Sequence, residues 1–259
     1  MYGRRILILV PHPDDEVVGC CAAIGRARSR GAEIFAFYLT HGCVARSVMW
    51  PWMKWRYGRA VMRRRVEAQR VSVQLGIMPV GWSERPARHI WREMRQTYAE
   101  IREAATKNAI DQIWVPAYEG GNADHDATNA LAARLRLESS SAMTVLEFAE
   151  YNYAGAKAHS QTFPELSGRE QALILTPEER AFKAKMLAEY ESEQDNLNYV
   201  ELERETCRSL AHYDYNAPAH DGTQWYARFH WVPFRHPRVD FTQPQEVCAA
   251  IAAFMKEKV

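Results

Sequence analysis

The segment PHPDDE, residues 11–16, places one histidine and three acids directly after the apolar run of residues 5–10. Zinc accepts imidazole and carboxylate ligands, and a catalytic zinc site takes three protein ligands and keeps a fourth position for water. His12 and Asp15 are therefore candidate ligands, and the proline on each side of His12 stiffens the backbone there. Asp14 is a candidate general base, because a free carboxylate beside a bound water can take its proton.

A second polar segment, EGGNADHDATN at residues 119–129, follows another apolar stretch and contains His125. This histidine completes a set of three ligands of the types that zinc prefers. A metal that lowers the pKa of bound water, together with a carboxylate that takes the proton, is typical of a hydrolase. The sequence therefore predicts one Zn²⁺ held by His12, Asp15 and His125, with Asp14 as the catalytic residue.

Each segment also has a simpler interpretation when it is taken alone. His-Pro-Asp-Asp is typical of a turn in which Asp14 or Asp15 is the N-cap of the helix that follows. His125 alone is typical of a surface residue at the start of a helix. Two such segments, each between a strand pattern and a helix pattern, favour the metal site over the capped turn.

The elements that position these residues alternate between strand and helix patterns along the first half of the chain. Because this alternation is typical of βαβ units, we expect an α/β fold with a Rossmann-like, mostly parallel sheet and helices on both faces. Ligands bind beyond the carboxyl ends of such strands, so both polar segments would face one crevice. The predicted strands are 5–10, 33–40, 110–117 and 143–151, and the predicted helices are 16–30, 59–76, 88–107 and 125–139.

The second half of the chain has a different pattern. We expect helices over 177–194, 196–210 and 244–257, and an aromatic, proline-punctuated C-terminal region that includes a half-buried strand from Trp225 to Trp231. No linker or repeat separates the halves. We therefore predict a single domain over 1–259, with a Rossmann-like core and the metal site in 1–150 and an extension in 151–259 that completes the substrate cleft.

Charge and cysteine content restrict the functional classes. The 259 residues carry a net charge of +1, which argues against a nucleic-acid partner. No apolar run approaches the roughly 20 residues of a membrane span. Five cysteines without regular spacing favour a reducing compartment, and the predicted location is the cytoplasm, with peripheral membrane contact as an option.

The segment SVMWPWMKWRYGR, residues 47–59, interleaves aromatic and basic residues after the second predicted strand. It is typical of a hydrophobic lid or a subunit contact in a homo-oligomer. Alternatively, it captures substrate: Trp50 and Trp52 would stack on a sugar or an acyl chain, and Arg56 would meet phosphate. A lipid- or phosphate-linked sugar, or the surface of a membrane, would suit both residue types.

The first half of the chain resembles the PIG-L/LmbE-like zinc-dependent N-deacetylases. The resemblance rests on PHPDDE, on the small-residue helix and strand that follow, and on the segment EGGNADHDATN, which resembles the family's H-x-D-H motif. Two further matches are Thr40-His41-Gly42 with the family's T-x-G turn, and RRRVEAQRVSVQLG at 63–76 with its R-x-x-E helix.

The resemblance implies zinc ligands His12, Asp15 and His125, Asp14 as the base, and Asp124 as a carboxylate that orients a ligand. It also implies removal of the N-acetyl group from an N-acetylated amino sugar, with Asn122 near the reacting group. Glu119 is a further candidate substrate contact, because it lies beside the metal segment and could meet a sugar hydroxyl. One departure is that Asn122 replaces the first histidine of H-x-D-H. Alternative interpretations are therefore a catalytically lapsed module that binds a glycan or lipid, or an amidase on a non-sugar amide. Replacement proton donors are His41, Tyr151, Tyr153, His159 and His220.

Overall fold

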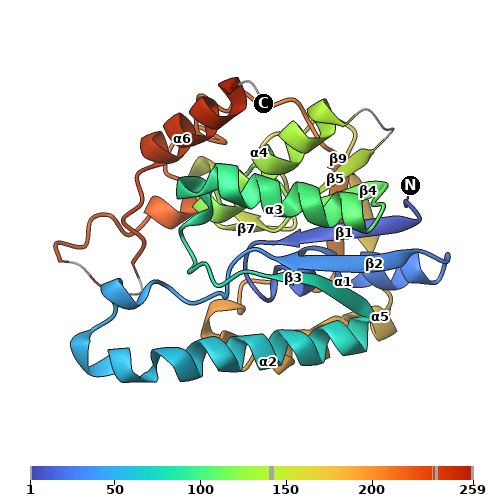
Figure 1. The fold of residues 1–259 in the computed structure, drawn as a ribbon, viewed down its shortest axis with the longest axis horizontal. Coiled ribbons are helices and arrows are strands. Elements are labelled where there is room, and N and C mark those ends of the chain that lie inside the picture. Colours follow the sequence, from blue (N-terminus) through green and yellow to red (C-terminus); the bar gives the residue numbers. More distant parts are fainter. Residues whose placement is uncertain (1, 140–142, 235, 237–238, 258–259) are drawn as a thin grey trace.

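A seven-stranded sheet with the order β3-β2-β1-β4-β5-β9-β8 forms the centre of the computed structural model, which describes residues 2–139, 143–234, 236 and 239–257 (Figure 1). The first five strands in this order are parallel, and β9 and β8 are antiparallel additions. The expected α/β class with a mostly parallel sheet is confirmed. The strands are β1 Arg5–Val10, β2 Glu33–Tyr38, β3 Ile77–Trp82, β4 Gln112–Pro116, β5 Thr144–Ala149, β8 Gln171–Ile174 and β9 Arg204–Ser209, and a separate pair is β6 Tyr151–Asn152 with β7 His159–Ser160.

Three helices cover each face of the sheet, as expected (Figure 1). Alternate residues of a strand point to opposite faces, so Ile6 and Ile8 of β1 pack in one apolar cluster while Leu7 and Leu9 pack in the other. The first cluster lies under α1 Asp15–Arg28, α2 Tyr57–Leu75 and α5 Pro177–Glu189. The second lies under α3 Met94–Lys107, α4 Ala123–Glu138 and α6 Pro244–Lys256. No helix in the described part of the chain has the length and apolar character that a bilayer crossing requires.

The strand order places the two polar segments at the switch point of the sheet. β1 pairs in parallel with both β2 and β4, and the chain crosses to one side after β1 and to the other side after β4. The loops that leave these two neighbouring strands therefore diverge and leave a crevice at the carboxyl edge, which is the usual ligand site of an open α/β sheet. His12 follows β1, and His125 lies in the first turn of α4 after β4.

The helix expected over 196–210 is wrong, because residues 204–209 form strand β9. Glu205 stabilises the strand conformation of this segment. Its fully buried carboxylate accepts hydrogen bonds from the backbone N–H groups of Ala22 and Ala23, both at 2.9 Å, and from Lys183 Nζ at 3.0 Å. These N–H groups are available because α1 leaves helical geometry at Cys20, where φ is −147°. This long-range contact outweighs the helix propensity of the segment.

Two further predictions from the sequence differ from the structure. The stretch from Trp225 to Trp231 begins with a single 3₁₀ turn, Trp225–Ala227, and contains no strand. The apolar pattern of residues 59–76 predicts inward positions for Ala60, Val61, Val66, Val73 and Leu75. Of these, Leu75 is buried, but Val66 and Val73 are 42% and 80% exposed. The buried face instead carries Arg64, Glu67, Ala68, Val71, Ser72 and Leu75. The strands β3 and β8 were not expected from the sequence.

Substitution of Glu205 by alanine should destabilise the protein by about 3–5 kcal/mol, because it leaves the Lys183 ammonium buried without a counter-charge. The two N–H groups of α1 would lose their acceptor as well. Urea unfolding followed by circular dichroism measures the change. The matched control is Glu203→Ala, which removes an exposed pair with Arg180 and should change stability by less than about 1 kcal/mol. Equal losses in both variants would contradict the structural role of Glu205.

Candidate metal centre

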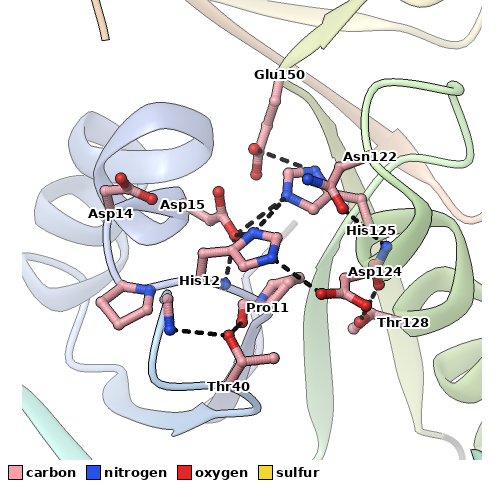
Figure 2. A network of polar contacts seen from close by, with 12 residues as sticks. Pro11, His12, Asp14, Asp15, Thr40, Asn122, Asp124, His125, Thr128 and Glu150 are labelled. Carbon is pink, nitrogen blue, oxygen red and sulfur yellow. Dashed lines mark hydrogen bonds and ion pairs between the residues drawn. The ribbon is translucent and has the colours of Figure 1, made fainter. Parts of the chain in front are cut away.

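Three side-chain atoms from the two loops form a nearly equilateral triangle (Figure 2). His12 Nδ1 lies 3.2 Å from His125 Nε2 and 3.3 Å from Asp15 Oδ2, and the remaining side of the triangle is 3.2 Å long. Ligands about 2.0–2.2 Å from a tetrahedral zinc lie roughly 3.3–3.6 Å from one another. The spacing and the donor set of two nitrogens and one oxygen therefore fit a divalent metal. These are the three residues that were predicted as ligands from the sequence.

The backbone of the PHPDDE loop is held on both sides. The His12 N–H donates to Asp15 Oδ2 at 2.7 Å, and the Thr40 hydroxyl at the end of β2 donates to the Pro11 carbonyl at 2.7 Å. Asp15 is the first residue of α1, where a carboxylate also interacts favourably with the helix dipole. Both ligands of this loop are therefore fixed relative to β1.

Asp124 orients the His12 ring. Its Oδ2 lies 3.1 Å from His12 Nε2, and its Oδ1 accepts the backbone N–H of Ile90 at 2.9 Å. A carboxylate on Nε2 fixes the tautomer that leaves Nδ1 free to bind a metal. The structure thus places Asp124 where the resemblance put it, beside a predicted ligand.

Glu150 occupies the corresponding position beside the other histidine. One carboxylate oxygen of this buried residue lies 3.5 Å from His125 Nδ1, and neither atom has a hydrogen-bond partner among the described residues. A Cβ atom at position 19 would lie only 3.0 Å from the Glu150 carboxylate. Because Gly19 has no Cβ, the Glu150 side chain has room beside α1. Glu150 was not among the residues predicted from the sequence, where its one signal is an acid directly after the apolar residues of β5.

The electrostatic environment of the triangle favours a positive charge. Burial alone would lower the pKa of His12, but hydrogen bonds to Asp124 and Asp15 raise it to about 10. Burial would raise the pKa of Asp15, but His125 and His12 hold that pKa below its ordinary value. Two carboxylates around the ring of His12 therefore stabilise either a proton or a metal cation between them.

Asp14 lies beside Asp15 at the start of α1 (Figure 2), at the N-cap position, but its side chain makes no capping hydrogen bond. The capped-turn interpretation is therefore wrong for Asp14. Its Oδ2 lies 3.2 Å from the guanidinium of Arg64, which is buried on α2. Asp14 has φ of +130°, a conformation that non-glycine residues rarely adopt and that marks many functional sites. Burial raises the pKa of Asp14 well above its ordinary value, while Arg64 lowers it.

Two residues predicted to contact substrate have structural roles. Asn122 is the N-cap of α4, where its Oδ1 accepts the Asp124 N–H at 2.9 Å. Glu119 is fully buried, and its carboxylate accepts the backbone N–H groups of Glu150 at 2.7 Å and Tyr151 at 3.0 Å. The expected contact between Glu119 and a sugar hydroxyl is therefore corrected, because this side chain fixes the end of β5 and has no exposed surface.

Of the alternative proton donors, Tyr151 contacts a residue of the triangle. Its ring packs edge-on against His125 with centroids 5.6 Å apart. Burial raises the pKa of Tyr151 well above its ordinary value, so the hydroxyl stays protonated and able to donate a hydrogen bond. His41 Nε2 lies 2.9 Å from the Tyr57 hydroxyl.

The structure does not bring the Trp-rich residues into the triangle. Trp50 and Trp52 stack on each other with centroids 5.2 Å apart, and Arg56 lies over Trp55. None of these contacts reaches the triangle, so substrate capture by Trp50, Trp52 and Arg56 stays a prediction.

A model of the PIG-L family, described as GlcNAc-PI de-N-acetylase, matches residues 7–135, and both ligand loops lie inside the match. The chain belongs to the PIG-L family. Within this family assignment, the triangle, Asp14 and Asp124 all lie in the matched segment, whereas Glu150 lies beyond it. No curated protein matches the sequence significantly.

Solved structures share the fold of this PIG-L protein. One is a deacetylase from the biosynthesis pathway of teicoplanin, at 20% identity and a TM-score of 0.63, covering 81% of this chain and 99% of that chain. Another is N,N′-diacetylchitobiose deacetylase from Pyrococcus horikoshii, at 17% identity and a TM-score of 0.55, covering 75% and 73%. A third is GalB, a 4-carboxy-2-hydroxymuconate hydratase from Pseudomonas putida, at 14% identity and a TM-score of 0.53, covering 82% and 98%. These similarities establish the fold, and a hydratase among them shows that the fold carries more than one reaction.

Glu150→Gln should lower the affinity for Zn²⁺ about tenfold or more, because loss of a carboxylate partner on a ligand histidine weakens metal binding by that order. Competition with a chromophoric chelator measures the affinity of the metal-free protein. The control is Glu138→Gln, which changes a carboxylate at the other end of α4 and should leave the affinity unchanged. Unchanged affinity in Glu150→Gln would show that His125 needs no such partner.

Proposed function

We propose that the protein is a zinc-dependent hydrolase that removes the N-acetyl group from an N-acetylated amino sugar, giving acetate and a free amine. The observation that carries the proposal is the His12, Asp15 and His125 triangle, with sides of 3.2–3.3 Å, next to the separate carboxylate of Asp14. Membership of a family described as GlcNAc-PI de-N-acetylase supports an N-acetyl amide as the bond that is hydrolysed. Zinc bound at the triangle would lower the pKa of a water molecule and polarise the acetamide carbonyl.

Asp14 is the residue that moves the proton. Its raised pKa brings the carboxylate closer to the pH at which it works, where a general base is most effective. Arg64 holds one carboxylate oxygen, and the other has no hydrogen-bond partner among the described residues. The free oxygen accepts the proton from the attacking water and then delivers it to the leaving amine.

Asn122 cannot deliver that proton, although its amide can donate a hydrogen bond to an oxyanion. In this chain the Asn122 side chain is engaged as the cap of α4. The cap uses only the Asn122 carbonyl oxygen, so it is the lack of a proton donor at position 122 that favours the second candidate, a lapsed family member that binds a glycan or lipid without hydrolysis.

The substrate in this proposal is an N-acetylglucosamine-type conjugate with a lipid- or phosphate-linked aglycone, supported by the tryptophans and arginines of residues 47–59. We also propose a cytoplasmic location. All five cysteines are free and four of them are buried, which suits a reducing compartment.

Asp14→Asn should reduce acetate release from N-acetylglucosamine conjugates by about 10²-fold or more while one zinc per chain is retained, because the variant loses only the base. Asparagine tolerates positive φ, so the backbone at this position should be preserved. Activity and metal content are measured on the same preparation, with the exposed Asp195→Asn as control. Full activity in Asp14→Asn would refute the assignment of the base, and binding of conjugates without acetate release in the wild type would favour the second candidate.

Asn122→His should increase kcat for acetate release by about tenfold or more if proton delivery to the amine limits the natural protein. Because histidine is a poorer N-cap than asparagine, the variant should also lose about 1 kcal/mol of stability. Asn122→Asp serves as the matched control, since aspartate keeps the cap without introducing an imidazole. An unchanged kcat in Asn122→His would show that Asp14 alone suffices for both proton transfers.

A further inference from the structure

Two loops at the carboxyl edge of the sheet expose large apolar side chains. In the loop that precedes α2, Trp52 and Trp55 are 66% and 61% exposed, and in the C-terminal region Trp231 and Phe234 are 75% and 60% exposed. We call this set the rim surface, which also includes Val48, Met53 and Phe229. Monomeric soluble proteins seldom leave so many large apolar side chains exposed together without a function.

The two loops lie side by side at the left end of the ribbon in Figure 1. A ring contact joins them, because Trp50, which stacks on Trp52, packs edge-on against His236 with centroids 6.1 Å apart. The C-terminal loop also connects to the metal centre: Trp225 packs on Tyr151, and Tyr151 packs on His125. The rim surface therefore lies at the end of the molecule that carries the candidate site.

The loop of the rim surface that precedes α2 carries charges of one sign. Residues 46–66 contain seven arginines or lysines and no acid. Arg46, Lys54, Arg56 and Arg59 form no ion pair with any described acidic side chain. Arg56 and Arg59 lie over the ring of Trp55, 4.7 and 4.6 Å from its centroid. Exposed tryptophan next to unpaired cations is the combination that anionic lipid surfaces attract.

We propose that the rim surface docks the protein on an anionic lipid bilayer. Trp52, Trp55, Trp231 and Phe234 enter the interfacial layer, and the neighbouring basic residues contact lipid phosphates. Methionine, valine and phenylalanine beside the tryptophans suit an acyl environment better than a sugar. A second copy of the chain is a poorer occupant, because a two-fold contact would bring the same unpaired cations together. The proposal concerns attachment and holds whether or not the protein hydrolyses an amide.

Flotation of the full chain with phospholipid vesicles tests the proposal. Wild-type protein should float with vesicles that contain about 30% phosphatidylglycerol in phosphatidylcholine and float poorly with phosphatidylcholine alone, because the cations contribute to binding. Trp55→Ala/Trp231→Ala and, separately, Arg46→Glu/Arg59→Glu should each weaken binding about tenfold or more. Brominated lipids should quench the tryptophan fluorescence of the wild type more than that of the Trp55→Ala/Trp231→Ala variant.

The matched control is Leu166→Ala/Ile174→Ala, which removes two exposed apolar side chains from the region around β8 and should leave flotation unchanged. Absence of wild-type flotation with both vesicle types would overturn the proposal, as would equal binding to both. A third overturning result is a homodimer in light scattering that the Trp55→Ala/Trp231→Ala variant converts to a monomer, since the rim surface would then be a subunit interface.

Discussion

A concentration of negative charge at the carboxyl edge of the sheet is the constraint on which the rest of the centre depends. Asp15 and Asp124 lie 3.1–3.3 Å from ring nitrogens of the two histidines, and both carboxylates are buried. Glu150 lies 3.5 Å from His125, and there burial and the neighbouring acids raise the pKa of Glu150 well above its ordinary value. Buried charges of one sign require a compensating cation. The raised pKa of His12 supplies one as a proton, and the geometry of the triangle suits a metal in its place. The buried carboxylates at this edge therefore account both for the raised pKa of His12 and for the fit of a metal ion.

Much of the centre could be predicted from the sequence because its key residues lie close to apolar strand patterns. Runs such as residues 5–10 and 110–117 identify buried parallel strands, and the ends of such strands meet at one edge. His12, Asp15 and His125 follow from that rule. Asp124 required the resemblance to the PIG-L family, because an acid in the first turn of a helix is otherwise ordinary.

The rest of the structure depends on contacts between residues far apart in the sequence, and no local pattern contains them. Glu205 reads as part of a helix until its carboxylate is seen to hold the N–H groups of Ala22 and Ala23. The inward face of α2 carries Arg64 and Glu67 beside Leu75, so apolar periodicity placed Leu75 correctly but also predicted inward positions for Val66 and Val73, which are exposed. Glu119 was predicted to contact substrate because it lies beside the metal segment, yet its carboxylate accepts two backbone N–H groups. In each case a buried polar partner, which local patterns do not report, determines the position.

The break in α1 at Cys20 also has a consequence for the order in which the chain acquires its structure. The N–H groups released there are satisfied by a strand that is synthesised about 180 residues later, as the sequence separations of 183 and 182 show. During translation the helix that begins with Asp15 therefore lacks its acceptor until β9 has left the ribosome. Contacts between residues so far apart in the sequence slow folding, so α1 stays without this support until β9 is available. The nascent chain can therefore complete the support of α1, which begins with the candidate ligand Asp15, only after β9 has been synthesised.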